Sequence, residues 1–165
     1  MTKTLWTIGY ERVGQSAFVA ALQSAGVKTL VDVREIANSR RAGFSKTSLA
    51  AALSEVGIGY LHLKALGTPK LGRLAARAGD HKTMSKIFTA KLAEPESQMA
   101  LAELGEMACK GRVCIMCLEH DWKHCHRAIV AKRLEKDAGL APAHILPEAS
   151  LGSGAFEHAD GGEHQ

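Results

Sequence analysis

Residues 113–127 concentrate side chains that can do chemistry. This stretch holds three of the four cysteines, together with three histidines and two acidic residues. A loop that only reverses the chain favours Gly, Pro, Asn and Ser, whereas thiols and imidazoles titrate, bind metals or attack electrophiles. The stretch begins with an apolar run and continues into the helical pattern of residues 128–134. We therefore predict a strand, a loop and a helix, with the reactive residues between strand and helix.

Four residues of this stretch are candidates for a catalytic role. Cys117 comes first, because a thiolate is an effective nucleophile and metal ligand and nearby cations lower the pKa of a thiol. Cys125 precedes the predicted helix, whose N-terminal N–H groups and dipole also favour a thiolate. Glu119 and His126 are candidates for proton transfer. Structural roles remain open for all four: buried cysteines, an ion-paired glutamate and a hydrogen-bonded histidine.

A metal site is a weaker interpretation of the same residues. Cys117, Cys125 and His126 offer three ligands, the number that an open catalytic zinc site takes from the protein. Cys114 and Cys117 have knuckle-like spacing, but residues three apart on a strand point to opposite faces. The sequence offers no second ligand pair, so we assign no metal. It identifies no cofactor either, since it contains neither Gly-x-Gly-x-x-Gly nor a phosphate loop.

Two other cysteine chemistries match the spacing poorly. A tyrosine-phosphatase loop needs Cys-x5-Arg, but the sixth residue after Cys117 is Lys123. A redox dithiol usually has Cys-x-x-Cys before a helix, whereas Cys117 and Cys125 are eight residues apart. A bond between these two cysteines therefore requires the intervening loop to fold back.

The elements that must position these residues alternate along the chain. Apolar and β-branched runs predict five strands, at residues 5–8, 29–33, 58–63, 112–118 and 143–146. Helical spacing predicts helices at residues 16–25, 46–56 and 125–138, and a helical insertion at about 70–110 that breaks near 79–80 and 94–95. This alternation predicts a single α/β domain over residues 1–147, with a mainly parallel sheet flanked by helices. Residues 148–165 are predicted to form a disordered tail.

Polar residues follow the predicted strands at their carboxyl ends, where ligands bind in open parallel sheets. Gly9 and Tyr10 follow the first strand, and Asp32 and Arg34 close the second. Arg127 lies in the helix after the fourth strand and, with Arg34, can clamp a phosphate or carboxylate. The cationic segment 39–46 supplies further candidates for substrate binding, with Phe44 available to stack on a base: Ser39, Arg40, Phe44 and Lys46. The alternatives for these groups are ion pairs that hold the loops, and a phenyl ring packed in the core.

Composition and charge narrow the function classes. The apolar runs are too short to cross a bilayer, which needs about 20 residues, and the N-terminus has no signal-peptide core. We expect a cytoplasmic protein whose cysteines are mostly reduced. Four of the 17 acidic residues and none of the 21 basic ones lie in residues 148–165, which leaves a charge of +8 on the rest of the chain. This charge favours an anionic small molecule or nucleic acid as partner.

Seven short segments, spread in order over residues 5–146, resemble the motifs of the bacterial family called domain of unknown function (DUF) family 488. They are Thr7-Ile8-Gly9-Tyr10, Asp32-Val33-Arg34, Asn38-Ser39-Arg40, Gly43-Phe44-Ser45-Lys46, Leu66-Gly67-Thr68-Pro69-Lys70, Cys117-Leu118-Glu119 and Cys125-His126-Arg127. In that family Gly9 is often followed by His and Ser, where this chain has Tyr10 and Glu11. The resemblance implies the α/β fold and the location of the site, and it brings no activity.

Our preferred hypothesis is an enzyme that acts on an anionic, phosphate-bearing substrate such as a nucleotide or nucleic acid. The cationic groups Arg34, Arg40 and Arg127 would bind the anion. Cys117 would serve as nucleophile or ligand, with Glu119 and His126 in proton transfer. One alternative is a non-catalytic nucleic-acid-binding module, whose binding weakens with salt. Another is a thiol redox sensor that forms a bond between Cys117 and Cys125.

Overall fold

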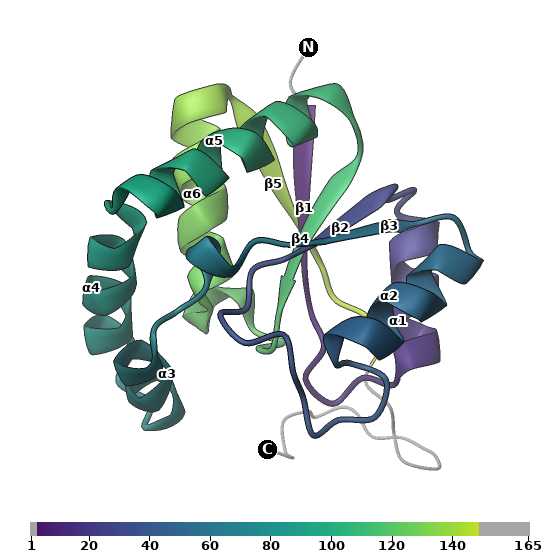
Figure 1. Cartoon of the computed structure of the whole chain (residues 1–165), viewed down its shortest axis with the longest axis horizontal. Coiled ribbons are helices and arrows are strands. Elements are labelled where there is room, and N and C mark those ends of the chain that lie inside the picture. The colour runs from purple at the N-terminus through teal and green to yellow at the C-terminus, as the bar shows by residue number, and fades with distance from the viewer. Residues whose placement is uncertain (1–2, 149–165) are drawn as a thin grey trace.

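A computed structural model of the chain describes residues 3–148. Its centre is a five-stranded parallel sheet with the strand order β3-β2-β4-β1-β5 (Figure 1). The strands are β1 (Lys3–Gly9), β2 (Thr29–Asp32), β3 (Gly59–His62), β4 (Val113–Cys117) and β5 (Leu140–Ile145). The helices are α1 (Gln15–Ser24), α2 (Lys46–Glu55), α3 (Lys70–Arg77), α4 (His81–Leu92), α5 (Pro95–Lys110) and α6 (His126–Ala138). The predicted α/β class is confirmed.

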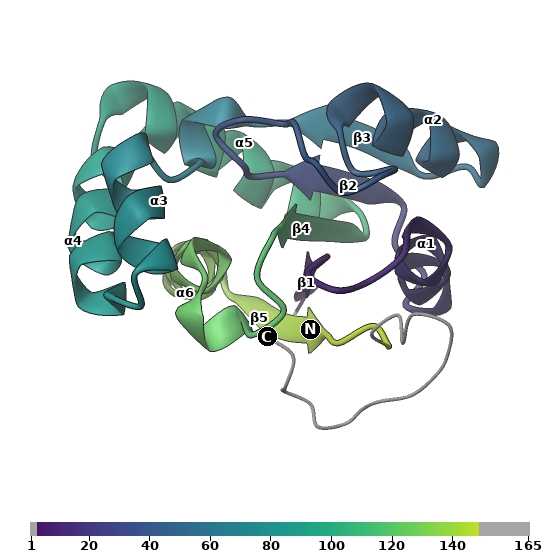
Figure 2. The same ribbon diagram turned by 90° about the horizontal axis from the view of Figure 1, so that it is seen from below.

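Helices cover both faces of the sheet, so its central strands are buried on both sides. Figure 2 shows α1 and α2 on one side of the sheet and α3 to α6 on the other. Leu30 and Cys114 pack in the core under α1 and α2. Val31 and Ile115, their neighbours along β2 and β4, pack in the core on the opposite face. This double burial explains why both strands are nearly continuous apolar runs in the sequence.

The predicted helical insertion forms three helices that cover one face of the sheet. Its breaks fall where local chemistry places them: Pro95 occupies the first turn of α5, and Asp80 accepts a hydrogen bond from the backbone N–H of Thr83 at the start of α4. Met84 and Phe88 of α4 and Leu104 of α5 then enter the core. The insertion therefore packs directly against one face of the sheet and does not form a separate unit.

The last strand begins earlier than the sequence predicts. β5 starts at Leu140 and includes Pro142, which lies beside Leu5 of β1. Proline cannot donate a ladder hydrogen bond, but an edge strand tolerates it because one side of that strand is unpaired. The predicted tail lies outside the described residues, apart from residue 148. Among residues 3–148, no helix combines the length and the apolar character needed to cross a membrane.

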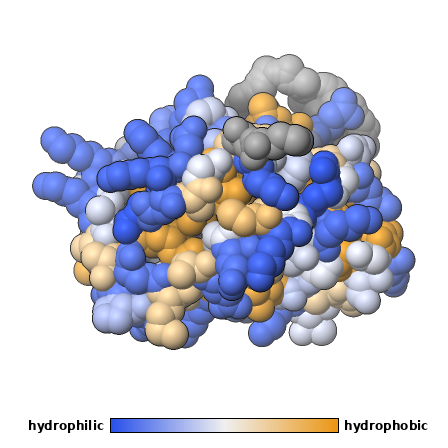
Figure 3. Space-filling view, turned by 90° about the horizontal axis from the view of Figure 1, so that it is seen from above, coloured by the Kyte–Doolittle hydropathy of each residue, from blue (hydrophilic) through white to orange (hydrophobic). Residues whose placement is uncertain are grey.

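The carboxyl ends of the strands meet on one side of the sheet. The segments that follow β1, β2 and β4 all run below the sheet in Figure 1. The space-filling view from above shows the other side, where apolar side chains lie in patches separated by hydrophilic ones (Figure 3). The loops with most of the polar candidate residues therefore share the carboxyl-end side, as the parallel topology requires.

The end of α6 provides a test of the local backbone rules. Gly139 caps this helix in the left-handed conformation, with φ of 68°, and no neighbouring atom obstructs a Cβ there. The variant Gly139→Ala should therefore lower the free energy of unfolding by about 1 kcal/mol, purely through backbone strain. Gly111→Ala is the matched control, because Gly111 ends α5 in an extended conformation and should be neutral. Chemical denaturation measures both, and equal losses would contradict the explanation.

Candidate functional site

A cavity of about 270 Å³ lies at the carboxyl ends of the strands. Its walls come from segments that are distant in the sequence, including the loops after β1, β2 and β4 and the helix α3. The residues that line it are Tyr10, Arg34, Glu35, Ile36, Asn38, Thr68, Arg73, Ala76, Arg77, Met84, Cys117, Leu118, Glu119, His124, Cys125 and His126. All four residues predicted to be catalytic are in this wall, together with Tyr10 and Arg34.

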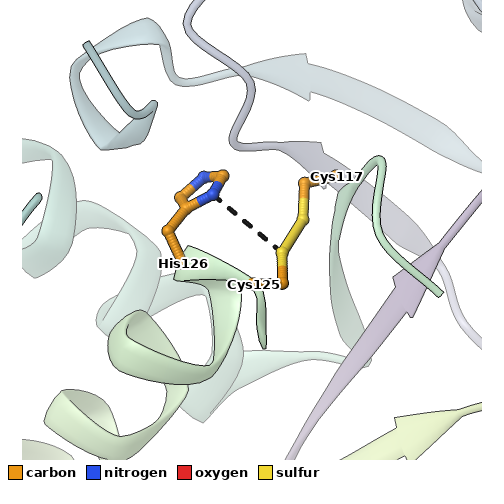
Figure 4. Close-up of side chains that lie close together, drawn as sticks. All are labelled: Cys117, Cys125 and His126. Carbon is orange, nitrogen blue, oxygen red and sulfur yellow. Dashed lines mark hydrogen bonds between the residues drawn. A yellow bond between two sulfur atoms is a disulfide. The ribbon is translucent and has the colours of Figure 1, made fainter. Parts of the chain in front are cut away.

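The two cysteines of the wall face one another across the loop between β4 and α6. Cys117 ends β4, and Cys125 is the N-cap of α6. The loop folds back through a short 3₁₀ helix, Trp122–His124, in which the backbone N–H of Lys123 donates to the side chain of Asp121. The two sulfur atoms are joined in a disulfide (Figure 4). Cys114 packs in the core on the other face of β4, which confirms that it and Cys117 point apart.

Arg127 lies beneath the cavity and ties four segments together. Its side chain is 0% exposed, and Nε donates to Thr7 Oγ1 of β1 at 3.1 Å. One terminal nitrogen donates to the carbonyl oxygen of Glu119 at 2.5 Å and lies 3.4 Å from Cys117 Sγ. The other donates to the carbonyl oxygen of His120 at 3.3 Å. Burial lowers the pKa of Arg127 to about 10, so the guanidinium stays charged at neutral pH.

Gly9 allows this close approach. It ends β1 beside Cys117 in the parallel register. A Cβ atom at this position would collide with the backbone carbonyl of Glu119 and would also contact the guanidinium of Arg127. Gly9 therefore serves the site through its missing side chain, which lets the segment after β4 pack on the end of β1.

Glu119 brings a carboxylate to the sulfur pair. Its Oε1 is 3.7 Å from Cys117 Sγ. Burial raises the pKa of Glu119, and the charges of Arg127 and Arg77 only partly oppose this. A carboxyl group with a raised pKa is a better proton acceptor near neutral pH, as general base catalysis requires.

His126 is buried, and its orientation is set by backbone and aromatic contacts. Its Nε2 is 2.7 Å from the carbonyl oxygen of Val33, and its ring packs edge-on against Phe88. Since a carbonyl only accepts hydrogen bonds, Nε2 carries the proton and Nδ1 keeps a free lone pair. Nδ1 lies 4.0 Å from Cys125 Sγ. Burial lowers the pKa of His126 to about 4, so the imidazole is neutral at physiological pH.

Asp32 and Arg34 form a buried ion pair behind the cavity. Arg34 donates two side-chain hydrogen bonds to the carboxylate, at 2.8 and 2.6 Å. Tyr60 of β3 donates a third at 2.5 Å, and Asp32 is completely buried. Arg34 also contacts the hydroxyl of Tyr10. Asp32 therefore positions Arg34 and does not reach the cavity, which corrects its predicted role in substrate binding.

The cationic segment after β2 lies outside the cavity wall. Phe44 is 0% exposed and packs between Tyr10 and Phe18, so the prediction that it stacks on a base is wrong: the ring completes the core under α1 and α2. Ser39 accepts a hydrogen bond from the backbone of its own loop. Arg40 and Lys46 are exposed and do not line the cavity, and Arg127 lies below it. None of these residues is placed to touch a ligand in the cavity.

Two arginines of the wall were missed from the sequence. Arg73 and Arg77 lie four residues apart on α3, the first helix of the insertion. Arg73 pairs with Glu35 and donates to the carbonyl oxygen of Thr68. The preceding segment, Leu66–Lys70, was recognised as a family motif. The four-residue spacing of the two arginines after this motif places them on the same face of a helix and could have indicated their role. The same spacing is also common on solvated helices.

Comparison with known families places this chain. The family model described as "Domain of unknown function DUF488" matches residues 15–134. The chain belongs to this family. The matched region of this DUF488 protein includes every cavity residue except Tyr10, so most of the site lies in the part shared with the family. No curated protein and no solved structure matches the chain.

The central role of Arg127 in this DUF488 fold predicts a large effect of its removal. Arg127→Met keeps an aliphatic side chain but removes the donor from the part-buried carbonyls of Glu119 and His120, at about 1–3 kcal/mol each. We expect the free energy of unfolding to fall by about 3 kcal/mol in urea denaturation. Arg133→Met is the control: its side chain on α6 pairs with Asp137 near the surface and should contribute less than about 1 kcal/mol. Similar losses in both variants would contradict the role of Arg127.

Burial of neutral His126 predicts a defined pH dependence of stability. Below pH 6.5 the unfolded chain binds a proton at this imidazole, which the folded chain binds only near pH 4. The free energy of unfolding should therefore fall by on the order of 3 kcal/mol as the pH drops from about 6.5 to about 4. Urea denaturation of the reduced protein, with EDTA present to remove metal ions, measures this fall at several pH values. His126→Gln should flatten it, whereas substitution of the exposed His124 should not.

Proposed function

We propose that this DUF488 protein is an enzyme that binds a small anionic substrate in the cavity and transforms it with the help of thiolates. One observation carries the proposal: Cys117 Sγ lies 3.7 Å from the carboxylate of Glu119 and 3.4 Å from the guanidinium of Arg127, in the wall of a 270 Å³ cavity. A cation next to a thiol lowers its pKa. A carboxylate at this distance can accept its proton.

The charges of the wall support an anionic substrate. Three arginines and two glutamates line the cavity. Arg34 and Arg73 are each held by a carboxylate, so their positions are fixed before a ligand binds. Arg77 is exposed, and among residues 3–148 its side chain has no hydrogen bond or ion pair. It replaces Arg40 and Arg127 in our assignment, because a guanidinium at the mouth can take a phosphate or carboxylate through two N–H groups.

The size of the cavity favours a small substrate. Its volume of about 270 Å³ lies just below the usual range for ligand sites, about 300–1,000 Å³. A phosphate-bearing metabolite or one nucleotide end group suits this space better than a polynucleotide strand. Phe44 is 0% exposed, so this ring cannot supply the stacking surface that a nucleic-acid-binding module would use.

The proposed proton transfer is simple. The S–H proton of Cys117 passes to the carboxylate of Glu119, which becomes a neutral acid, and the thiolate is stabilised by Arg127. Both products suit the surroundings, since burial raises the pKa of Glu119 and Arg127 supplies the positive charge. The later return of this proton to a leaving group would complete general acid–base catalysis.

A second function is favoured by the disulfide. Because Cys117 and Cys125 are bonded to one another, oxidation would remove both thiolates from the site. The protein would then be active when reduced and inactive when oxidised, as a thiol redox sensor is. Mass spectrometry of the alkylated protein after mild oxidation, without and with a reductant, would distinguish a reversible bond from thiols that remain reduced throughout.

Turnover by the reduced protein tests the enzymatic proposal. In a screen of phosphate monoesters and nucleotides, Cys117→Ala and Glu119→Gln should each lower kcat by at least about 100-fold, the usual contribution of a group that transfers protons. Circular dichroism should show both variants folded. Cys109→Ala is the matched control, because Cys109 is a free cysteine that does not line this cavity. Activity that survives Cys117→Ala in folded protein would refute the proposal.

The same assay separates binding from chemistry. Arg77→Ala should raise KM by about tenfold, equivalent to about 1.4 kcal/mol of binding free energy, with little change in kcat. Arg40→Ala removes an exposed arginine that does not line the cavity and serves as the control. Equal effects of the two substitutions would indicate general electrostatic attraction instead of a site at Arg77.

A further inference from the structure

Three soft donor atoms converge on one point of the cavity wall. Cys117 Sγ, Cys125 Sγ and a ring nitrogen of His126 all lie within 4.8 Å of one another (Figure 4). In tetrahedral zinc sites the Zn–S and Zn–N bonds are about 2.3 and 2.0–2.1 Å, so the ligand atoms are roughly 3.5–3.8 Å apart. The 4.0 Å between Cys125 Sγ and His126 Nδ1 is close to this separation.

The histidine is already oriented as a metal ligand. Its Nε2 donates to the carbonyl oxygen of Val33, and Phe88 packs against its ring. Metal-binding histidines typically donate their other ring N–H to a carbonyl or carboxylate, which fixes the tautomer and the direction of the ring. Here the fixed tautomer leaves the lone pair of Nδ1 on the side of the sulfur atoms.

Each sulfur atom also has an N–H donor beside it. The backbone N–H of Arg127 lies 3.5 Å from Cys125 Sγ, and its guanidinium lies 3.4 Å from Cys117 Sγ. Such donors stabilise thiolates that bind a metal. The two negative charges of the thiolates balance the two positive charges of a divalent cation, and the imidazole is neutral. The positive charge of Arg127 is in turn nearly balanced by the carboxylate of Glu119. The cluster would therefore bury no net charge, which would otherwise be costly.

The backbone spacing of the two cysteines points the same way. Their Cα atoms are 7.7 Å apart, whereas disulfides usually join Cα atoms 4.4–6.8 Å apart. Thiolates that share a zinc ion are about 3.8 Å apart, and this larger gap between sulfur atoms suits more widely spaced Cα atoms. The loop from β4 to α6 thus holds its two cysteines at a separation that favours a shared ligand.

We propose that the reduced protein binds one zinc ion through Cys117 Sγ, Cys125 Sγ and His126 Nδ1, with a fourth position open to the cavity beside Glu119. Sulfur and imidazole ligands select zinc over hard cations. The site deepens the proposed function and rests on it for its purpose: the thiolates act as ligands, and Glu119 accepts a proton from the molecule at the fourth position. Three protein ligands and an open position are the arrangement of catalytic zinc.

Metal binding and the disulfide exclude one another. A dithiol reductant transfers two electrons and two protons to the Cys117–Cys125 bond and itself becomes a disulfide. Zinc then displaces the two thiol protons, which pass to solvent. Exchange with a disulfide oxidant, which takes the two electrons and is itself reduced to two thiolates, would re-form the Cys117–Cys125 bond, remove two ligands and release the ion.

Zinc content of the full chain tests this site without any substrate. Protein is incubated with zinc, either reduced under anaerobic conditions or oxidised to the disulfide, then desalted and measured by mass spectrometry of metals. We expect about one zinc per reduced chain and almost none per oxidised chain. Cobalt added in place of zinc should give the intense visible bands of tetrahedral coordination and a thiolate charge-transfer band. This comparison uses wild-type protein, so it does not depend on the folding of a variant.

Substitutions then identify the ligands. Cys117→Ser, Cys125→Ser and His126→Asn should each weaken zinc at least 100-fold in competition with a chromophoric chelator, whereas Cys109→Ser and His124→Asn should not. Equal zinc in reduced and oxidised protein, or equal loss in Cys109→Ser and Cys117→Ser, would overturn the site. Thiol-dependent turnover that persists in zinc-free reduced protein would overturn the catalytic role of the metal and leave the proposed enzyme standing. Zinc binding without turnover on any substrate would support the metal and count against the enzyme.

Discussion

The buried guanidinium of Arg127 is the interaction on which the site depends. One charged group without exposure joins β1 at Thr7, the end of β4 at Cys117 and the backbone of the loop at Glu119 and His120. A buried charge is tolerated only when hydrogen bonds and opposite charge compensate it. The loop carbonyls supply that compensation, so the position of the loop and the burial of the charge require one another. The geometry of the candidate site is therefore a consequence of satisfying one buried cation.

The arginines that line the cavity differ in whether a carboxylate holds them in place. Arg34 is fixed by Asp32, and Arg73 by Glu35, which removes the freedom of two flexible side chains before any ligand arrives. Arg77 lines the cavity and has no such ion pair among the described residues. Such an arrangement would suit a small anion, because the fixed arginine side chains lose little conformational freedom when a ligand binds.

Three chemical states compete for the two thiols. In our proposals Cys117 and Cys125 are joined, free beside Glu119, or bound to a soft metal with His126. The joined state closes the site, and the other two require a reducing environment. A single geometry, with both sulfur atoms near N–H donors of Arg127, serves all three states. The redox control and the catalysis that we propose therefore need not be separate functions of this DUF488 protein.

The order of strands and helices was determined by the sequence alone, because apolar periodicity and caps such as Pro95 act over a few residues. The grouping of Cys117, Glu119, Cys125 and His126 also followed from local position, at the end of one strand and the start of one helix. Only the tertiary structure decided that Phe44 enters the core, that Arg127 supports the site from below and that α3 closes the cavity with its own arginines. Burial and ion pairing depend on partners tens of residues away, such as the 120 positions between Thr7 and Arg127. The residues adjacent in the sequence do not indicate which distant residue will be the partner, so these roles could not be predicted from local sequence patterns.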